Sequence, residues 1–472
     1  MIAPLLVLGR GSARHGFACG FVFGLGFFGS LLVWISVVGW IAWTVLVLME
    51  ALYLGLFGAS WAVLSRADRK WWVLLAPAAW VTAEVLRASV PVVGFPWGEL
   101  AQSQGVFPWL LQIAQLGGGE TVSFLLVAVN ACVALAFLER GVARLRWTAA
   151  GVIAIAAMVP LSFLLPAILP TGAGGDGEVL RVAIIQGNAS PGVEVEDGRA
   201  RVARHLRLTQ ALVGERIDLV VWPESSVGID PFTDENVASM VAEAARAVDA
   251  WMIVGANLDA GEDRYNVVTL LIDPTGEIVD VYQKTHLVPF GEYVPWREAL
   301  DWIPMLEQIP RDAVAGDTPK NFVVPGREGP GLERLEHEIG TVISFEGDFG
   351  HLVRERVALG ARVMTVATNT STWKRTWASA QHLAMSQVRA AETGVPVIHA
   401  ALSGISAFVY FDGTVGKRTD LYEEATIVSD VATGIGSTVY VRTGEWLPII
   451  CTLGTISAVA AALARRRNTV RT

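Results

Sequence analysis

Charged residues are scarce in this chain of 472 residues: Asp, Glu, Lys and Arg make up 17% of it, and hydrophobic residues make up 53%. A soluble domain is usually about a quarter charged, so the composition argues against a purely cytosolic enzyme. Basic residues are especially few in the middle of the chain, where 171–446 contain 23 Lys and Arg against 39 Asp and Glu, a net charge of −16. This balance argues against a nucleic-acid partner, which would need a basic surface.

Cysteine is nearly absent. The three cysteines, Cys19, Cys132 and Cys451, each lie in an apolar stretch. They cannot form a disulfide in the middle of the chain, and their spacing does not form a metal-binding cluster. A buried cysteine is usually just a small hydrophobe. We therefore expect neither a metal nor a cofactor, and 171–446 contains no thiol.

The apolar residues are gathered into runs long enough to cross a bilayer core, which takes about 20 residues of helix. The candidate spans are 17–36, 39–64, 71–90, 119–138, 148–169 and 446–464. The second is long enough to tilt or to break near Gly55 and Gly58. We expect transmembrane helices over 1–170 with about five spans, a soluble domain over 171–445, a last span over 446–464, and a basic tail over 465–472.

The basic residues between the spans predict the orientation of the chain in the membrane. By the positive-inside rule, every basic cluster falls on the cytoplasmic side: Arg10 and Arg14; Arg66, Arg69 and Lys70; Arg140, Arg144 and Arg146; Arg465, Arg466 and Arg467. Five spans before residue 171 then place the soluble domain on the opposite face. Met1–Leu8 is too short to span and shows no signal-peptide pattern, so we expect it to be the remainder of an upstream helix.

Two ionisable residues stand near the end of the third span, before the loop Pro91-Val-Val-Gly-Phe-Pro-Trp-Gly-Glu99. Glu84 and Arg87 are three residues apart, which places them on one helix face. Ionisable groups at membrane depth are candidates for function. A mutual salt bridge that only stabilises the helix end is an equally good interpretation.

The middle of the chain alternates short β-branched runs with a helical segment and turns. Strands are expected at 180–185, 218–222, 250–254, 265–272, 341–345 and 363–367, with a helix over roughly 196–214 and hairpin turns at 273–276 and 412–413. Strands alternating with helices are typical of a layered α/β fold. About 260 residues can bury a core as one domain.

Three chemically useful residues stand at or just after expected strand ends, where α/β folds place their chemistry. Glu224 follows Trp222-Pro223, Lys284 follows Tyr282-Gln283, and Ser344 lies in Val342-Ile-Ser-Phe-Glu346. A carboxylate can act as a base, an ammonium can stabilise an oxyanion and a hydroxyl can attack a carbonyl. Taken singly, each is more often only a solvated side chain.

The set of motifs resembles the nitrilase superfamily, and more narrowly the bacterial apolipoprotein N-acyltransferases. The similar segments are Trp222-Pro-Glu-Ser225, 284–295, 340–346, 381–394, 404–407 and, in the membrane part, Glu84, Arg87 and Gly94-Phe-Pro-Trp97. The resemblance runs from near residue 2 to about 464. It implies an α-β-β-α sandwich attached to membrane helices, a frame that soluble nitrilases lack.

The resemblance also implies a reaction and roles for residues. A phospholipid would give an acyl chain to the enzyme, and the α-amine of a diacylated apolipoprotein would take it. Glu224 would be the general base, Lys284 the oxyanion stabiliser and Ser344 the nucleophile. Glu292 would orient the lysine, and Phe345 and Glu346 would flank the nucleophile. Candidates for substrate contact are Glu84, Arg87, Trp97, Asn266 and Trp373.

The chain departs from the family at its nucleophile, because Ser344 stands where the family has cysteine, and Phe345 where it usually has tyrosine. A free cysteine has a pKa of about 8.5 and a serine hydroxyl is roughly five pKa units weaker, so forming its oxyanion costs on the order of 7 kcal/mol more. Serine hydrolases meet this cost with a histidine base. His286 and His382 could serve, although most such histidines are only packed. Ser344 is therefore an engineered substitution, a natural loss of activity, or an active serine variant.

One further departure is the segment 369–374, which is Asn-Thr-Ser-Thr-Trp-Lys in place of the family's Asn-Asp-Ala-Trp-Phe-Gly. The other is the start, since the family usually has extra apolar spans before this point, so we expect either a misassigned start or missing upstream helices. Two other functions stay open. One is an inactive membrane scaffold that binds lipoprotein or a partner enzyme; in some actinobacterial relatives the module is fused to a polyprenol-phosphate mannose synthase, which makes such a synthase a candidate partner. The other is a membrane-tethered amidase.

Overall fold

The chain folds into two compact units in the computed structural model, which describes residues 2–90, 94–168, 179–189, 197–300, 302–326, 336–434 and 436–471. The first unit is Met1–Leu169 with Thr443–Thr472, and the second is Pro170–Arg442. The start of the expected loop, 91–93, and the expected boundary at 170–171 lie outside the described residues.

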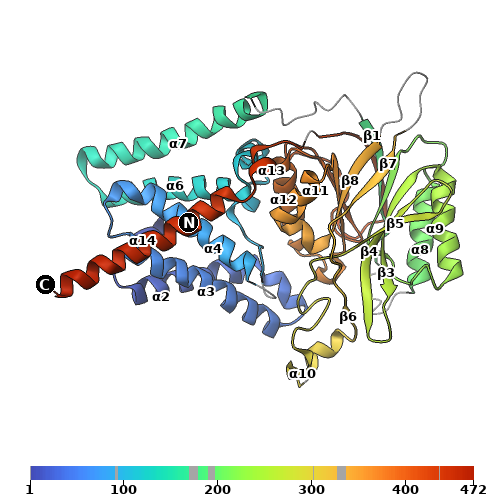
Figure 1. Cartoon of the computed structure of the whole chain (residues 1–472), viewed down its shortest axis with the longest axis horizontal. Coiled ribbons are helices and arrows are strands. Elements are labelled where there is room, and N and C mark those ends of the chain that lie inside the picture. The colour runs from blue at the N-terminus through green and yellow to red at the C-terminus, as the bar shows by residue number, and fades with distance from the viewer. Residues whose placement is uncertain are drawn as a thin grey trace. The chain divides into compact units, whose positions relative to one another are not determined.

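The first unit is helical (Figure 1). Its elements are α1 (Ile2–Leu8), α2 (Ala13–Leu31), η1 (Val33–Val37), α3 (Trp40–Leu64), η2 (Arg69–Trp71), α4 (Trp72–Ser89), η3 (Leu100–Gln104), α5 (Pro108–Leu111), η4 (Gln112–Leu116), α6 (Gly119–Leu138), α7 (Gly141–Ile168) and α14 (Trp446–Arg471). Among the described residues, four helices are long and apolar enough to cross a membrane: Trp40–Leu64, Gly119–Leu138, Gly141–Leu164 and Trp446–Arg466.

Two of the expected spans form helices that do not meet this test, α2 and α4. Glu84 and Arg87 lower the mean hydropathy of α4, and Arg14, His15 and several glycines lower that of α2. The first expected span, 17–36, also ends earlier as an α-helix, because the chain continues as the 3₁₀ helix η1. The number of five spans before the soluble part stays a prediction.

The expected break in the second span does not occur, since α3 is one continuous helix. Its glycines serve close packing against α2 instead. A Cβ added at Gly58 would lie 2.1 Å from the carbonyl oxygen of Gly16 on α2, and one added at Gly55 would lie 2.7 Å from the ring of Phe17. Small residues at such positions let two helix backbones approach closely in a membrane.

The second unit is built on two sheets (Figure 1). The first has the order β13-β1-β2-β3-β4-β5, with β6 paired to β4, and the second has the order β12-β11-β10-β9-β8-β7. The strands are β1 (Val179–Gln186), β2 (Leu219–Val227), β3 (Trp251–Asp259), β4 (Arg264–Ile272), β5 (Ile278–Gln283), β6 (Asp312–Ala313), β7 (Asn321–Pro325), β8 (Glu336–Ile343), β9 (Val363–Thr368), β10 (Val397–Ala401), β11 (Ala407–Val409), β12 (Val415–Arg418) and β13 (Ala425–Ala432).

Helices cover the outer face of each sheet. The helical elements of this unit are α8 (Gly198–Gln210), α9 (Glu235–Val248), α10 (Arg297–Leu300), η5 (Pro304–Gln308), η6 (Ser344–Asp348), α11 (Gly350–Ala358), η7 (Ser371–Trp373), α12 (Ala378–Thr393) and α13 (Val439–Thr443). Figure 1 shows α8 and α9 beside the first sheet and α11 and α12 beside the second.

Three layers of buried apolar side chains hold the two sheets and their covering helices together. The central one joins the inner faces of both sheets, with Val182, Leu219 and Ile253 from the first sheet and Ile339 and Ile398 from the second. The two outer layers join α8 and α9 to the first sheet and α11 and α12 to the second. The expected α-β-β-α sandwich is confirmed.

Candidate active site

Glu224 lies at an irregular point of β2. The register between β2 and β3 shifts between Trp222 and Val227, so β2 contains residues that β3 does not match. Gly255 on β3 accommodates this bulge, since a Cβ there would lie 2.2 Å from the carbonyl oxygen of Pro223. Bulges re-aim side chains near active sites. Here the bulge carries the carboxylate of Glu224, which is buried.

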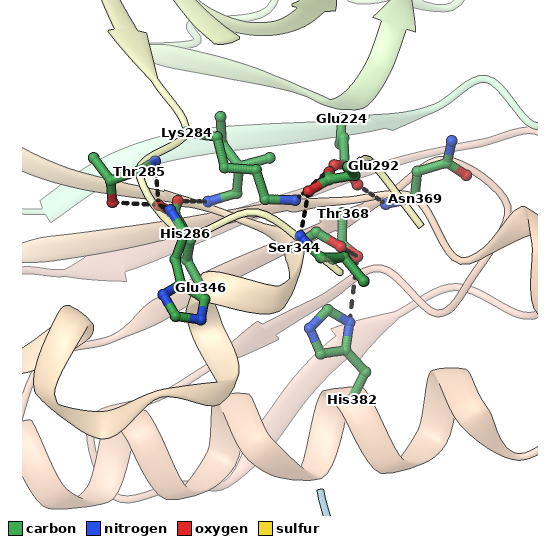
Figure 2. Close-up of polar contacts among 12 residues, drawn as sticks. Glu224, Lys284, Thr285, His286, Glu292, Ser344, Glu346, Thr368, Asn369 and His382 are labelled. Atoms are coloured by element: carbon green, nitrogen blue, oxygen red, sulfur yellow. Dashed lines mark hydrogen bonds and ion pairs between the residues drawn. The ribbon is translucent and has the colours of Figure 1, made fainter. Parts of the chain in front are cut away.

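Lys284 follows the end of β5, and its ammonium lies between two carboxylates (Figure 2). Lys284 Nζ is 2.6 Å from Glu292 Oε1 and 3.4 Å from Glu224 Oε1, and the lysine is fully buried. The other oxygen of Glu292 accepts a hydrogen bond of 2.7 Å from the backbone N–H of Val288. Glu292 is therefore fixed by its own loop, and it fixes the direction of the ammonium.

The charges in this group depend on one another. Burial raises the pKa of Glu224, and the Glu292 carboxylate raises it further, while the Lys284 ammonium and the backbone N–H of Asn369 act to lower it. Burial disfavours the ammonium of Lys284, but the two carboxylates hold its pKa above the ordinary value. The two carboxylates therefore favour the charged form of the lysine, and the raised pKa makes Glu224 a stronger base than an exposed carboxylate.

Ser344 is the first residue of η6, directly after β8. Sequence analysis expected the strand to continue through residue 345, but it ends at Ile343 and Ser344 adopts a left-handed backbone conformation with φ of 51°. Its hydroxyl acts to lower the pKa of the Glu224 carboxylate, and its Oγ is 3.1 Å from Thr368 Oγ1. Unlike Glu224 and Lys284, Ser344 is partly exposed. Sharp, strained turns of this kind present nucleophiles.

The carboxylate of Glu346 is fully engaged in holding this turn. Its Oε1 accepts hydrogen bonds from Tyr282 Oη, from the backbone N–H and hydroxyl of Thr285 and from the backbone N–H of His286, at 2.8 to 3.1 Å. Its Oε2 accepts one of 2.8 Å from the backbone N–H of Ile343. Glu346 thus ties the segment that begins at Lys284 to the turn that carries Ser344 (Figure 2).

The remaining candidates in this unit contact their own neighbours. The ring of Phe345 packs edge-on against that of Phe349, with centroids 5.0 Å apart. Asn266 Oδ1 accepts a hydrogen bond of 3.1 Å from Gln283 Nε2. Trp373 is the last residue of η7. The structure brings Glu224, Lys284 and Glu292 into contact, and it brings Ser344 into contact with Thr368. A substrate role for Phe345, Asn266 or Trp373 stays a prediction.

The candidates in the first unit serve the structure of that unit. Arg87 Nη1 forms an ion pair of 3.3 Å with Glu50 Oε2 and donates hydrogen bonds of 2.7 Å to the carbonyl oxygens of Phe95 and Trp97. The alternative interpretation, a salt bridge between Glu84 and Arg87, is therefore wrong, because Arg87 pairs with Glu50 instead. Glu84 Oε1 instead accepts hydrogen bonds from a tryptophan ring N–H and a backbone N–H of its own unit. A role for Glu84, Arg87 and Trp97 in binding substrate stays a prediction.

Sequence reasoning did not select Thr368 and Asp348, and it set His382 aside as a packed histidine. Thr368 is the last residue of β9, and its hydroxyl lies between Ser344 and His382. No motif spacing could have indicated this, because the contact joins the ends of two neighbouring strands to a helix. The one sequence feature that could have indicated Asp348 is its position in the turn that follows Ser344.

A carboxylate, an ammonium and a hydroxyl meeting at strand ends of stacked sheets define a member of the carbon–nitrogen hydrolases, whose family model matches residues 181–439. The model of the N-terminal domain of apolipoprotein N-acyltransferase matches residues 1–132.

Curated relatives cover both units. An apolipoprotein N-acyltransferase of Geobacter metallireducens is 32% identical over 99% of this chain and 91% of its own length. One of Mycolicibacterium smegmatis is 30% identical over 95% of this chain and 77% of its own length. Among solved structures, an amidase from Nesterenkonia sp. is 19% identical and covers 54% of this chain and 90% of its own, with a TM-score of 0.41. The chain belongs to the apolipoprotein N-acyltransferase family, and its sequence resemblance to that family is confirmed.

Proposed function

We propose that this chain transfers a fatty acyl chain from a membrane phospholipid to the α-amine of the diacylglyceryl cysteine of apolipoproteins, through an ester on Ser344. The family supports the reaction class and both substrates. The observation that carries the proposal is the convergence of three groups: the Glu224 carboxylate is 3.4 Å from the Lys284 ammonium, and the Ser344 hydroxyl acts to lower the pKa of the same carboxylate.

In the first half of the reaction, Ser344 Oγ attacks the ester carbonyl of the phospholipid while Glu224 takes its proton. The Lys284 ammonium stabilises the negative charge on the carbonyl oxygen. The bond to the glycerol oxygen then breaks, and Glu224 returns the proton to that oxygen. A lysophospholipid leaves, and the acyl chain remains on Ser344.

In the second half, the cysteine α-amine of the apolipoprotein attacks the Ser344 ester. Glu224 takes a proton from the amine, the bond from Oγ to the acyl carbon breaks, and the proton returns to Oγ. The product is an N-acylated lipoprotein and the free enzyme. Glu292 acts through Lys284, because it fixes the ammonium from the far side.

The serine makes both halves slow. A serine hydroxyl is a much weaker acid than a thiol, and each pKa unit corresponds to about 1.36 kcal/mol. An ester is also less reactive toward an amine than a thioester is. We therefore expect trace transfer by the chain as it stands and faster transfer by Ser344→Cys.

The proposal places the second unit on the outer face of the bacterial inner membrane. Its support is the positive-inside rule applied to the basic clusters between the spans. Phospholipid and apolipoprotein are both held in the membrane, so an acyl transfer between them needs an enzyme anchored there. Membrane helices would be unnecessary for hydrolysis of small soluble amides.

The test is mass spectrometry of a purified diacylated lipoprotein after incubation with phospholipid and the full chain in detergent micelles. We expect Ser344→Cys to transfer at least about tenfold faster than the serine chain, given that a thiol is roughly five pKa units more acidic. Ser429→Cys on β13 is the matched control, because it adds a thiol to the same unit outside the site. A silent Ser344→Cys chain that is folded would contradict the proposal.

A non-catalytic scaffold is the second candidate function, and the serine at the nucleophile position favours it. Its signature would be binding of diacylated lipoprotein with no transfer from either chain. A polyprenol-phosphate mannose synthase as partner stays a prediction tied to this function. Release of ammonia from small amides in the absence of lipid would instead indicate an amidase.

A further inference from the structure

A second set of polar side chains, separate from Glu224 and Lys284, reaches Ser344. Thr368 Oγ1 is 3.1 Å from Ser344 Oγ and 3.3 Å from His382 Nδ1. The other ring nitrogen of His382, Nε2, is 3.2 Å from Asp348 Oδ1. Thr368, His382 and Asp348 are all buried, and they come from β9, α12 and η6. Figure 2 shows His382 beside Ser344 and Thr368, with a dashed line for its contact with the Thr368 hydroxyl.

The surroundings of His382 favour its charged form. Burial disfavours the imidazolium, but the Asp348 carboxylate, the backbone of Ser344 and the more distant Glu224 together raise the pKa of His382 above the ordinary value. His399 on β10 packs against it with ring centroids 5.0 Å apart. The pKa of His399 is lowered, by burial and by the charge of His382, so it stays neutral beside its neighbour.

The direction of the hydrogen bonds follows from this charge. Both nitrogens of an imidazolium are donors. Nε2 lies at ion-pair distance from Asp348 without hydrogen-bond geometry, and the Nδ1–H of a charged His382 donates to Thr368 Oγ1. The single hydroxyl proton of Thr368 is then left to donate to Ser344 Oγ. The proton of Ser344 is in turn left for the Glu224 carboxylate. Each group in this series, from His382 through Thr368 to Ser344, therefore donates its proton in the direction of Glu224.

We propose that Asp348, His382 and Thr368 are positioning residues that activate the Ser344 hydroxyl as a nucleophile. The inference rests on the proposed function and concerns its first half. When Glu224 takes the proton and the bond from Oγ to the acyl carbon forms, negative charge develops on Oγ. The Thr368 hydroxyl, polarised by the His382 cation, stabilises that charge. The proton stays on His382 throughout, and Glu224 remains the only base.

This arrangement addresses the weakness of serine as an acid. A serine hydrolase uses histidine to remove the proton, but here a hydroxyl stands between histidine and serine. Charge-assisted hydrogen bonds are roughly twice as strong as neutral ones, and donors aimed at developing negative charge are worth more in a buried site. A thiolate needs such donors much less, since a thiol ionises readily and sulfur is a weak acceptor.

The experiment compares Thr368→Val in two chains, one with Ser344 and one with Ser344→Cys. The rate of acyl-enzyme formation from phospholipid is followed by intact-protein mass spectrometry of the full chain. We expect Thr368→Val to slow acylation of Ser344 by about 10- to 100-fold, in the range of other lost oxyanion donors, and to slow acylation of the Ser344→Cys chain by less than about threefold.

Thr365→Val is the matched control, because Thr365 is a buried threonine of β9 whose hydroxyl bonds only to the strand carbonyl of Gly340 among the contacts described. We expect it to leave both rates unchanged. An equal effect of Thr368→Val in both chains would indicate a packing role and overturn the inference.

A second measurement separates this inference from the proposed function. If neither chain forms an acyl-enzyme from phospholipid, the proposed function fails. The reaction of Ser344 with a fluorophosphonate then reports on the hydroxyl alone. Faster labelling of the Ser344 chain than of its Thr368→Val variant supports activation. Equal labelling, or none, overturns it.

Discussion

At the scale of single residues, two carboxylates share one ammonium. Glu292 lies closer to Lys284 than Glu224 does, at 2.6 Å against 3.4 Å. The lysine is therefore held mainly by Glu292, and Glu224 keeps enough of its basicity to take a proton. If Glu224 paired with the lysine as closely, its pKa would fall and it would be a weaker base.

The pH dependence of acylation should report how Glu224 and Glu292 share the Lys284 ammonium. Glu224 acts as a base only when ionised, so the rate rises with pH through its pKa, which burial raises. Glu292→Gln removes a negative charge that raises that pKa and leaves Lys284 to pair with Glu224. We expect the acid side of the profile to move to lower pH, with a lower maximal rate because the lysine loses its anchor. Acyl-enzyme formation measured against pH checks this.

Glu336→Gln is the control for this profile, because Glu336 is exposed at the start of β8. It should leave the profile in place. A Glu292→Gln profile that stays where it was, or moves to higher pH, would contradict the assignment of Glu224 as the base.

The Glu346 carboxylate should matter for stability. Its two oxygens accept hydrogen bonds from both segments that meet at the site. Glu346→Gln replaces one acceptor with a donor, so a buried N–H would face another donor. We expect a loss of roughly 1–3 kcal/mol, the usual cost of an unsatisfied buried group. Thermal unfolding in detergent measures it, and Glu336→Gln should unfold like the parent chain.

At the scale of elements, the sequence predicts strands better than it predicts their ends. The run expected at 265–272 is β4 (Arg264–Ile272), and the turn at 273–276 joins it to β5 with a hydrogen bond of 2.9 Å from Gly276 N–H to the Asp273 carbonyl oxygen. The alternation of apolar and polar residues and the turn residues are local signals, so they can be recognised in a single sequence. The bulge at Glu224 and the left-handed turn at Ser344 depend on neighbouring strands.

The residues of the candidate site likewise divide into those that local sequence signals indicate and those whose contacts exist only in the folded chain. Glu224, Lys284 and Ser344 could be selected from the sequence because each follows a recognisable run or motif. Thr368 could not, because its contact with Ser344 exists only once β9 pairs in parallel with β8. The role of Glu346 was likewise hidden, since all the partners of its Oε1 come from residues 282–286, far away in the chain.

The packing of α2 against α3 gives a prediction at this scale. A Cβ at Gly20 would lie 2.0 Å from the Leu54 carbonyl oxygen, so Gly20→Ala must push the two helices apart. Overpacking typically costs about 1–3 kcal/mol. We expect Gly20→Ala to lower the temperature at which the purified protein aggregates in detergent. Gly26→Ala on the same helix is the matched control, because a Cβ at Gly26 would have no atom within 4 Å. Equal losses in both variants would exclude close packing as the cause.

At the scale of the whole molecule, charge is divided between the two parts of the chain. The acidic excess lies in 171–446, whereas 1–170 contain 9 Lys and Arg and 6 Asp and Glu, with the basic residues clustered between spans. Arg66, Arg69 and Lys70 are one such cluster, between the second and third expected spans. From the positive-inside rule we expect this loop to be cytoplasmic and the second unit to be extracytoplasmic.

Cysteine labelling in intact spheroplasts tests this orientation, since the three native cysteines all lie in the first unit, two of them buried. Glu262→Cys, on an exposed loop between β3 and β4, should react with a membrane-impermeant maleimide in intact cells. Asp68→Cys, in the loop between α3 and α4, should react only after the membrane is opened. The unsubstituted chain measures the background. Labelling of Asp68→Cys but not of Glu262→Cys in intact cells would reverse the orientation and place the second unit in the cytoplasm, away from exported lipoproteins.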